Sequence, residues 1–131
     1  MKVLLDTNAL LWLLTQDEGA SKLGKDARRL IHSGDAVFVS AISVLEIRMK
    51  SMLGKLDANS DLLRDISDSG LKFLVFSVEA ADRVSEFPSL VRHDPFDRML
   101  LAQALCDEML LITADKVLLD LKLGYVIDAT K

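Results

Sequence analysis

The sequence predicts an α/β domain of three layers (α/β/α), with a central and mostly parallel β-sheet between helices. Short apolar runs alternate along the chain with segments of helical periodicity, which is the order expected of a parallel sheet. Half of the 131 residues are hydrophobic, and the mean hydropathy is +0.27. This richness fits a sheet that is buried on both faces, or an apolar surface reserved for a partner.

The first half of the chain is expected to contain two strands and three helices. The strands are apolar or β-branched runs, as pleated strands favour. Gly34 and Gly54 mark the ends of two helices, because glycine readily takes the conformation that ends a helix. In order, the expected elements are a strand at Lys2–Leu5, helices at Asn8–Leu14 and Lys22–His32, a strand at Ala36–Val39, and a helix capped by Ser40 or Ser43 that runs to about Leu53.

The second half continues the alternation. Gly70 and Pro88 each follow a helix, whereas Asp94 and Pro95 begin one, since aspartate caps a helix and proline suits its first turn. The expected elements are helices at Asp61–Ser69, Glu79–Phe87, Phe96–Cys106 and Lys116–Leu121, and strands at Leu71–Phe76, Met109–Thr113 and Tyr125–Ile127. No repeat, low-complexity stretch or linker interrupts them, so residues 1–131 are expected to form a single domain.

Composition and charge argue against several classes of protein. A net charge of −4 argues against a simple basic nucleic-acid binder, but not against an enzyme that holds nucleic acid through metal ions. Aromatic residues make up only 5%, so base-stacking platforms are not expected. No apolar run approaches the roughly 18 residues of a membrane span, and no signal peptide is evident. The single cysteine, Cys106, cannot form an intramolecular disulfide, so we expect a cytoplasmic protein with no membrane association.

Two aspartates follow strands directly. Asp6 ends the run "VLLDT", and Asp115 follows the run "LLITAD". Ligands of parallel sheets bind beyond the carboxyl ends of the strands, so both carboxylates would lie at the binding edge. Either one alone is explained as well by capping of the helix that follows it.

Two helices carry acids where apolar residues are expected. At 100° per residue, Glu46 lies within or at the margin of an apolar stripe, and Asp97 lies in the middle of the most apolar face of its helix. The stripe around Glu46 consists of Ile42, Leu45, Met49, Met52 and Leu53, and the face around Asp97 of Leu100, Leu101 and Ala104. Glu46 could instead extend to solvent from the margin. Asp94, one turn before Asp97, is well explained as a helix cap.

A cluster of these four carboxylates would need a cation. Two carboxylates about 4 Å apart repel by roughly 4 kcal/mol at an effective dielectric constant near 20. Oxygen ligands favour Mg²⁺ or Mn²⁺. Zinc fits poorly, because His32 and His93 show no ligand spacing with each other or with Cys106.

Four stretches resemble the PIN domain, and specifically the VapC-type ribonuclease toxins of toxin–antitoxin pairs. They are "LLDTNALLW", "SVLEIRMKSMLGKL", "HDPFDRMLLAQA" and "LLITAD", in the order of that family. The resemblance implies a PIN-like, Rossmann-like fold in which Asp6, Glu46 and Asp97 are the core metal-binding and catalytic acids. Asp115 corresponds to a fourth, more variable acid, and Asp94 is the less suitable member of "DPFD". Thr7, Asn8 and Thr113 fall where the family has polar residues that support the metal cluster.

The resemblance also implies a function. It is that of an endoribonuclease that hydrolyses RNA phosphodiester bonds with one or two Mg²⁺ (or Mn²⁺) ions, with Asp97 or Asp115 as the group that positions or deprotonates water. The implied partners are RNA and an antitoxin protein, as a homodimer or a hetero-oligomer. Val44 and Ile47 could contact a partner or be buried. RNA phosphates could bind to Lys22, Lys25, Arg28 and Arg29, although a solvated helix face explains these residues as well.

Other classes of function remain open. A Mg²⁺-dependent phosphatase or phosphotransfer domain could use Asp6 as its nucleophile. Dehalogenase-like enzymes, however, have a second aspartate where this chain has Asn8. A receiver-like signalling module would need paired acids after the first strand, which the sequence lacks. A catalytically inactive PIN-like interaction module is the third alternative.

Overall fold

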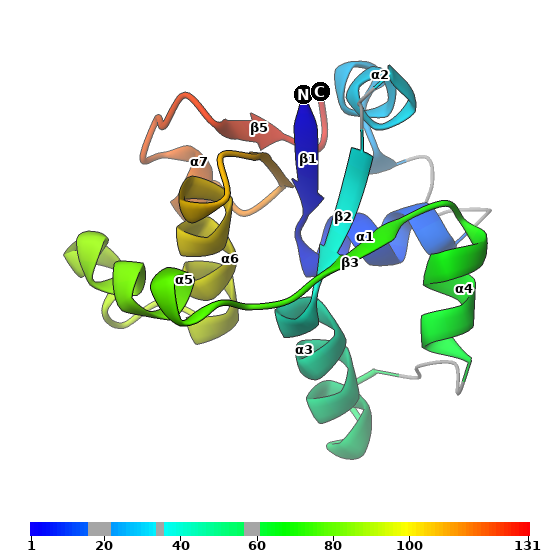
Figure 1. The fold of residues 1–131 in the computed structure, drawn as a ribbon, viewed down its shortest axis with the longest axis horizontal. Helices are drawn as coiled ribbons and strands as arrows, with labels where there is room; N and C mark the ends of the chain where they lie inside the picture. Colours follow the sequence, from blue (N-terminus) through cyan, green and yellow to red (C-terminus); the bar gives the residue numbers. More distant parts are fainter. Residues whose placement is uncertain (16–21, 34–35, 57–60) are drawn as a thin grey trace.

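The computed structural model describes residues 1–15, 22–33, 36–56 and 61–131. Within these residues, strands form one five-stranded sheet in the order β3-β2-β1-β4-β5 (Figure 1). All four strand pairs are parallel, which confirms the expected α/β class. The strands are β1 (Lys2–Leu5), β2 (Ala36–Ser40), β3 (Lys72–Leu74), β4 (Leu110–Thr113) and β5 (Val126–Asp128).

The strand order reverses beside β1, in the centre of the sheet. The chain runs outward from β1 through β2 to β3, then returns to place β4 against the other side of β1. Leu5 at the end of β1 therefore lies between Val39 of β2 and Ile112 of β4. Open α/β sheets bind ligands at such a reversal point, beyond the carboxyl ends of the strands.

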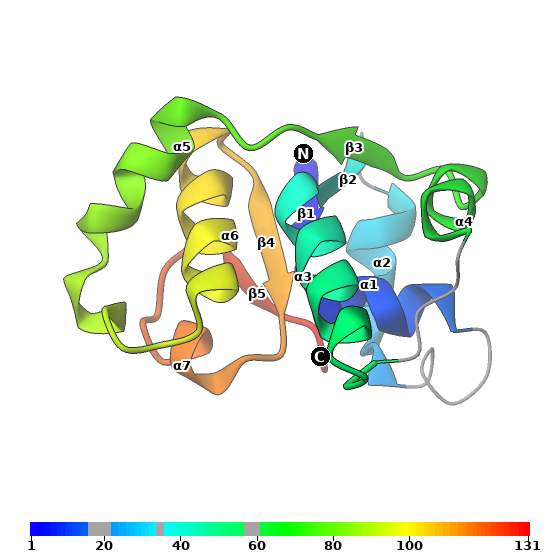
Figure 2. The same ribbon diagram turned by 90° about the horizontal axis from the view of Figure 1, so that it is seen from below.

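Helices cover both faces of the sheet (Figure 2). Val3 and Leu5 of β1 face one apolar core, whereas Leu4 faces the other. All three side chains are fully buried, as expected of a central strand in a three-layer fold. The helices are α1 (Thr7–Leu14), α2 (Lys25–Ser33), α3 (Ala41–Met52), α4 (Leu62–Asp68), α5 (Val78–Asp82), α6 (Pro95–Cys106) and α7 (Lys116–Leu119), with 3₁₀ turns η2 (Arg83–Glu86) and η3 (Pro88–Leu90).

Several boundaries differ from the expected ones. Ser40, not Ser43, caps α3, since its hydroxyl accepts a hydrogen bond from the Ile42 N–H at 3.0 Å. The helix expected at Glu79–Phe87 is α5 followed by the 3₁₀ turn η2. The strand expected at Leu71–Phe76 is only three residues long, because β3 is an edge strand with β2 as its one neighbour. In the described parts of the chain, no helix combines the length and apolar character needed to cross a membrane.

Candidate metal centre

Asp6 lies at the end of β1, where the sheet gives way to α1. Its side chain is 3% exposed and caps α1, with Oδ1 accepting a hydrogen bond from the Ala9 N–H at 2.7 Å. The other oxygen, Oδ2, accepts a hydrogen bond from the Thr113 hydroxyl at 2.5 Å. Burial raises the pKa of Asp6 to about 6, against the effect of these two hydrogen bonds and with a contribution from the charges of Glu46 and Asp115. Asp6 therefore serves as a helix cap and also as a charged group at the binding edge.

Glu46 projects from α3 into the same region. It is 4% exposed, so it does not extend to solvent. Its Oε1 accepts a hydrogen bond from the Thr7 hydroxyl at 2.7 Å, and its Oε2 lies 2.7 Å from the Lys50 ammonium. The hydrogen bond to Glu46 is the main cause that raises the pKa of Lys50, and the charges of Asp94 and Asp97 act in the same direction. Lys50 is thus a cation supplied by the protein at the edge of an acidic region.

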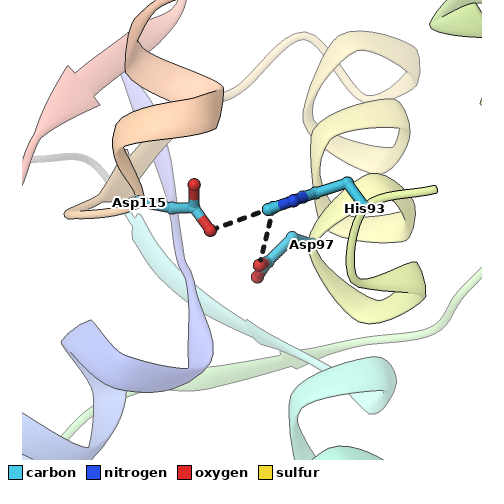
Figure 3. A group of neighbouring side chains, drawn as sticks. All are labelled: His93, Asp97 and Asp115. Atoms are coloured by element: carbon cyan, nitrogen blue, oxygen red, sulfur yellow. Dashed lines mark hydrogen bonds and ion pairs between the residues drawn. The ribbon is translucent and has the colours of Figure 1, made fainter. Parts of the chain in front are cut away.

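A third group comes from the opposite side of the reversal point (Figure 3). Asp97 lies in the first turn of α6, Asp115 precedes α7, and His93 lies in the turn before α6. The His93 Nε2 atom is 3.1 Å from Asp115 Oδ2 and 3.5 Å from Asp97 Oδ2. Each of these residues offers one ligand atom, and the three atoms all lie within 4.8 Å of one another. We call His93, Asp97 and Asp115 the His–Asp–Asp group.

Asp115, like Asp6, has two roles at once. Its Oδ1 accepts hydrogen bonds from the Val117 N–H at 2.8 Å and the Leu118 N–H at 3.3 Å, and so caps α7. Its Oδ2 faces His93. The cap and site interpretations of this residue are therefore compatible, because one carboxylate has two oxygens.

Negative charge is crowded around Asp97. Burial, the hydrogen bond with Asp115 and the charges of Asp94, Asp115 and Asp6 together raise the pKa of Asp97 to about 8, and burial is the largest of these causes. Burial also acts to raise the pKa of Asp115, but hydrogen bonds from Asp97, from His93 and from backbone N–H groups outweigh burial and lower it. Without a cation, the Asp97–Asp115 pair holds a proton near neutral pH. A divalent cation would take the place of that proton, so the donor set fits such an ion.

The charges of the predicted acids influence one another, but the four side chains are not all within contact distance of each other. Asp97 and Asp115 belong to the His–Asp–Asp group, whereas Asp6 and Glu46 do not. Thr113 connects the two sets, because its hydroxyl donates to Asp6 and accepts from the Asp115 N–H at 3.1 Å. The assignment of Asp6, Glu46, Asp97 and Asp115 as metal ligands stays a prediction.

The other predicted site residues divide by position. Thr7 and Thr113 contact acids directly, whereas Asn8 is exposed in the first turn of α1. The Asp94 carboxylate accepts a hydrogen bond from the Phe96 N–H at 2.9 Å and so caps α6. The interpretation of Asp94 as a helix cap is therefore confirmed.

The four basic residues proposed to bind RNA phosphates are exposed. The Lys22 ammonium lies 5.7 Å from the centroid of the Trp12 ring, and Arg29 is 3.8 Å from Asp26. Nothing in these contacts distinguishes a phosphate-binding surface from a solvated helix face. The RNA-binding role of Lys22, Lys25, Arg28 and Arg29 therefore stays a prediction.

Sequence reasoning missed His93 as a site residue. Its spacing to His32 and Cys106 excludes a zinc site, but a histidine can also share a cation with carboxylates. The available signal is its place in "HDPFD", immediately before the helix that carries Asp97.

Comparison with known proteins identifies the family. The sequence model of the PIN-domain family matches residues 3–122, so the chain belongs to that family. No curated protein matches the chain.

Three solved structures share the fold of this chain. VapBC-1 from nontypeable Haemophilus influenzae aligns with a TM-score of 0.70 and 17% identity over 100% of both chains. A toxin–antitoxin complex from Klebsiella pneumoniae aligns with a TM-score of 0.66 and 18% sequence identity over 97% of each chain. FitAcB from Neisseria gonorrhoeae aligns with a TM-score of 0.65 and 19% sequence identity, also over 97% of each chain. The expected PIN-like fold is therefore confirmed.

Proposed function

We propose that the protein is a metal-dependent endoribonuclease that hydrolyses RNA phosphodiester bonds as the VapC-type toxin of a toxin–antitoxin pair, and that residues 1–131 form one PIN domain. The observation that carries the proposal is the meeting of carboxylates from four separate segments around the reversal point of the sheet. Burial raises the pKa of Asp97 most, and the charges of Asp94, Asp115 and Asp6 raise it as well, so a cation bound here would stabilise the ionised carboxylates. Membership of the PIN-domain family makes a nuclease the chemistry that such a site would serve.

Asp97, Asp115, Asp6 and Glu46 would hold Mg²⁺ or Mn²⁺. The bound ion would lower the pKa of a water molecule and offset charge on the attacking and leaving oxygens. Thr113 and Thr7 fix the orientation of Asp6 and Glu46 through their hydrogen bonds. A carboxylate oxygen of Asp97 or Asp115 would accept the proton of the attacking water, because both side chains are only partly buried and reach solvent.

The phosphatase alternative is less well supported by the geometry of Asp6. A covalent nucleophile needs an oxygen that can reach the phosphorus atom. Asp6 is 3% exposed, one of its oxygens caps α1, and the other accepts the Thr113 hydrogen bond. We therefore assign Asp6 to the metal site and not to nucleophilic attack.

The activity is tested with a panel of structured and single-stranded RNAs. We expect cleavage with Mg²⁺ or Mn²⁺ and none in EDTA, with matched DNA strands left intact. Asp97→Asn should abolish cleavage, whereas Asp68→Asn, on the exposed surface of α4, should not. Cleavage that persists in EDTA would refute the metal mechanism. A folded protein that binds no divalent cation would instead be the inactive interaction module.

A partner is proposed for an apolar groove at the edge of the sheet. The groove has a volume of about 320 Å³, and its lining is mostly apolar. The residues that line it are Ala41, Val44, Leu63, Phe73, Leu74 and Val75. Beside it, α3 exposes Leu45, Met49 and Met52. Val44 therefore faces the groove, whereas Ile47 is fully buried in the core. An antitoxin segment that buries this apolar surface is the occupant we propose, as the Klebsiella pneumoniae relative was solved as a toxin–antitoxin complex.

Coexpression with the product of the adjacent gene tests the partner. We expect the two proteins to copurify and the complex to lose RNA cleavage. Phe73→Glu should disrupt the complex and leave cleavage by the free protein intact, because Phe73 is 47% exposed and lies on the edge strand β3. Self-association of the protein alone, measured by analytical ultracentrifugation and abolished by Phe73→Glu, would assign the groove to a homodimer instead.

A further inference from the structure

His93 lies where a ligand would complete the cation site. Its Nε2 atom is the ring nitrogen nearest to the carboxylates, 3.1 Å from one and 3.5 Å from the other. The side chains of the His–Asp–Asp group point toward one another from α6, from the turn before it and from the loop before α7 (Figure 3). The backbone holds this turn in place, since the His93 N–H donates to the Leu90 carbonyl at 2.9 Å.

The distances agree with ligands that share one ion. With metal–ligand bonds of about 2.1 Å, adjacent ligands of an octahedral ion lie about 3 Å apart and opposite ligands about 4 Å apart. The distances from His93 Nε2 to Asp115 and Asp97 fall in the range for adjacent positions. The three ligand atoms lie within 4.8 Å of one another, so one ion could contact all three and keep further positions for water, the other acids and substrate.

The simpler interpretation is that His93 only donates a hydrogen bond. One N–H points toward one acceptor, so a neutral ring would satisfy Asp115 and leave the contact to Asp97 to the proton that the carboxylate pair holds. A lone pair on Nε2 directed at an ion between the two carboxylates would explain both short distances. The two interpretations differ in which atom lies between the nitrogen and the oxygens, and this difference can be measured.

A nitrogen ligand changes which ions bind. Mg²⁺ prefers oxygen ligands, whereas imidazole suits the divalent transition metals. We infer that His93 ligates the divalent cation of this site through Nε2 and makes the site selective for Mn²⁺ over Mg²⁺. The inference rests on the proposed function, because it concerns the same cation, but it adds a ligand that the acidic motifs do not supply.

The chain contains a matched control. It has two histidines, His93 and His32, and His32 is exposed in the last turn of α2. His93→Gln replaces the nitrogen by a side chain of similar reach that can still offer an oxygen. His32→Gln makes the same chemical change away from the His–Asp–Asp group.

Calorimetric titration with Mn²⁺ and with Mg²⁺ gives the first readout. We expect the unmodified protein and His32→Gln to bind Mn²⁺ at least about tenfold more tightly than Mg²⁺. His93→Gln should lose about tenfold in Mn²⁺ affinity and change by less than about threefold for Mg²⁺. Equal losses for the two ions would overturn the selectivity claim.

Pulsed electron paramagnetic resonance of the Mn²⁺-bound protein gives a second readout that needs no substitution. A ligating imidazole couples its nitrogen to the Mn²⁺ electron spin, and labelling of histidine with ¹⁵N shifts the coupling frequencies. We expect this coupling in the unmodified protein. Bound Mn²⁺ without histidine coupling would overturn the ligation by His93 and leave the nuclease proposal intact. Failure to bind either ion would refute the proposed function itself.

Discussion

The two sides of the candidate site solve the problem of buried charge in different ways. On the β1–α3 side, Asp6 and Glu46 are 3% and 4% exposed, and each has protein partners on both carboxylate oxygens. On the α6–α7 side, the side chains of Asp97 and Asp115 are 18% and 22% exposed; Asp115 caps α7 with one oxygen, and its other oxygen contacts His93, which also approaches Asp97. The hydrogen bonds of the first side limit the pKa of the buried Asp6 to about 6, whereas the pKa of the less buried Asp97 on the second side is raised to about 8.

This difference indicates that one side is ordered before a cation binds and that the other is stabilised by the cation. A side with satisfied hydrogen bonds is rigid, and its acids are fixed before any ion arrives. A side with crowded carboxylates gains most when a cation enters, because the cation replaces a shared proton and removes the repulsion. We therefore expect Asp97→Asn and Glu46→Gln both to reduce cleavage and to have opposite effects on the stability of the metal-free protein.

Asp97→Asn should have the largest effect. The amide keeps the shape of the side chain but removes a charge that the ion needs, so we expect RNA cleavage to fall by at least about 10³-fold, as for loss of a group that acts in the transition state. The metal-free protein should become more stable by at least about 1 kcal/mol, or roughly 3–6 °C in Tm, because a carboxyl with a raised pKa is removed. Calorimetry in EDTA at pH 8 measures the shift.

Asp94→Asn is the control for this prediction. Asparagine can cap α6 as aspartate does, so cleavage should stay within a few-fold and the Tm should change little. A decrease in the metal-free Tm of Asp97→Asn would contradict the view that the α6–α7 side carries uncompensated charge.

Glu46→Gln should reduce cleavage by about 10²-fold or more, but with the opposite effect on stability. The substitution removes the charge that pairs with Lys50 and places an amide beside the Thr7 hydroxyl. We expect the free energy of unfolding to fall by about 1–3 kcal/mol in EDTA, as for a buried charged hydrogen bond that is broken. Urea denaturation measures it, with Glu79→Gln on the exposed face of α5 as the unaffected control. A more stable Glu46→Gln protein would mean that the two sides do not differ.

The strand-end acids and the fold could be predicted because their causes are local. An apolar strand that ends in aspartate places a carboxylate at the sheet edge whatever the strand order. Glu46 and Asp97 could be found because each interrupts an apolar helical face, and the structure shows Glu46 buried as that pattern required. These features follow from the periodicity of single elements.

The remaining features depend on contacts between distant segments. The pairing of β1 with β4 brings Thr113 to Asp6 across 107 residues, and no local pattern contains this information. His93 lies outside α6, so its approach to Asp115 depends on the path of the preceding turn. Asp6 and Asp115 each cap a helix with one oxygen and face the site with the other, and the sequence does not show which oxygen of a carboxylate faces which partner.

The stability of the metal-free protein should depend on pH, and most strongly through Asp97. The folded state has raised pKa values for Asp97, about 8, and for Asp6, about 6. Between the ordinary pKa near 3.8 and these values, the folded state binds more protons than the unfolded state, so its stability falls as the pH rises. For Asp97 the loss continues up to about pH 8, at no more than about 1.4 kcal/mol per pH unit.

Thermal unfolding in EDTA from pH 5 to pH 8 tests this dependence. We expect the Tm of the unmodified protein to fall across the range and that of Asp97→Asn to fall much less. Saturating Mn²⁺ should reduce the decline, because the ion favours the ionised carboxylates. Identical profiles for the two proteins in EDTA would show that the raised pKa of Asp97 does not govern the stability of the metal-free fold.

The smallest effect is expected from Lys50→Met, which removes the cation that the protein itself supplies. The Lys50 side chain is 43% exposed, so solvent screens its ion pair with Glu46, and we expect a loss of stability below about 1 kcal/mol. Because Glu46 Oε2 is then free to bind an ion, the affinity for Mn²⁺ should rise by about two- to fivefold, as expected when a competing cation is removed. Titration calorimetry measures both variants, with Lys55→Met, at another exposed lysine, as the control. If Mn²⁺ affinity is unchanged and the KM for RNA rises instead, Lys50 contacts the substrate phosphate and does not occupy part of the cation site.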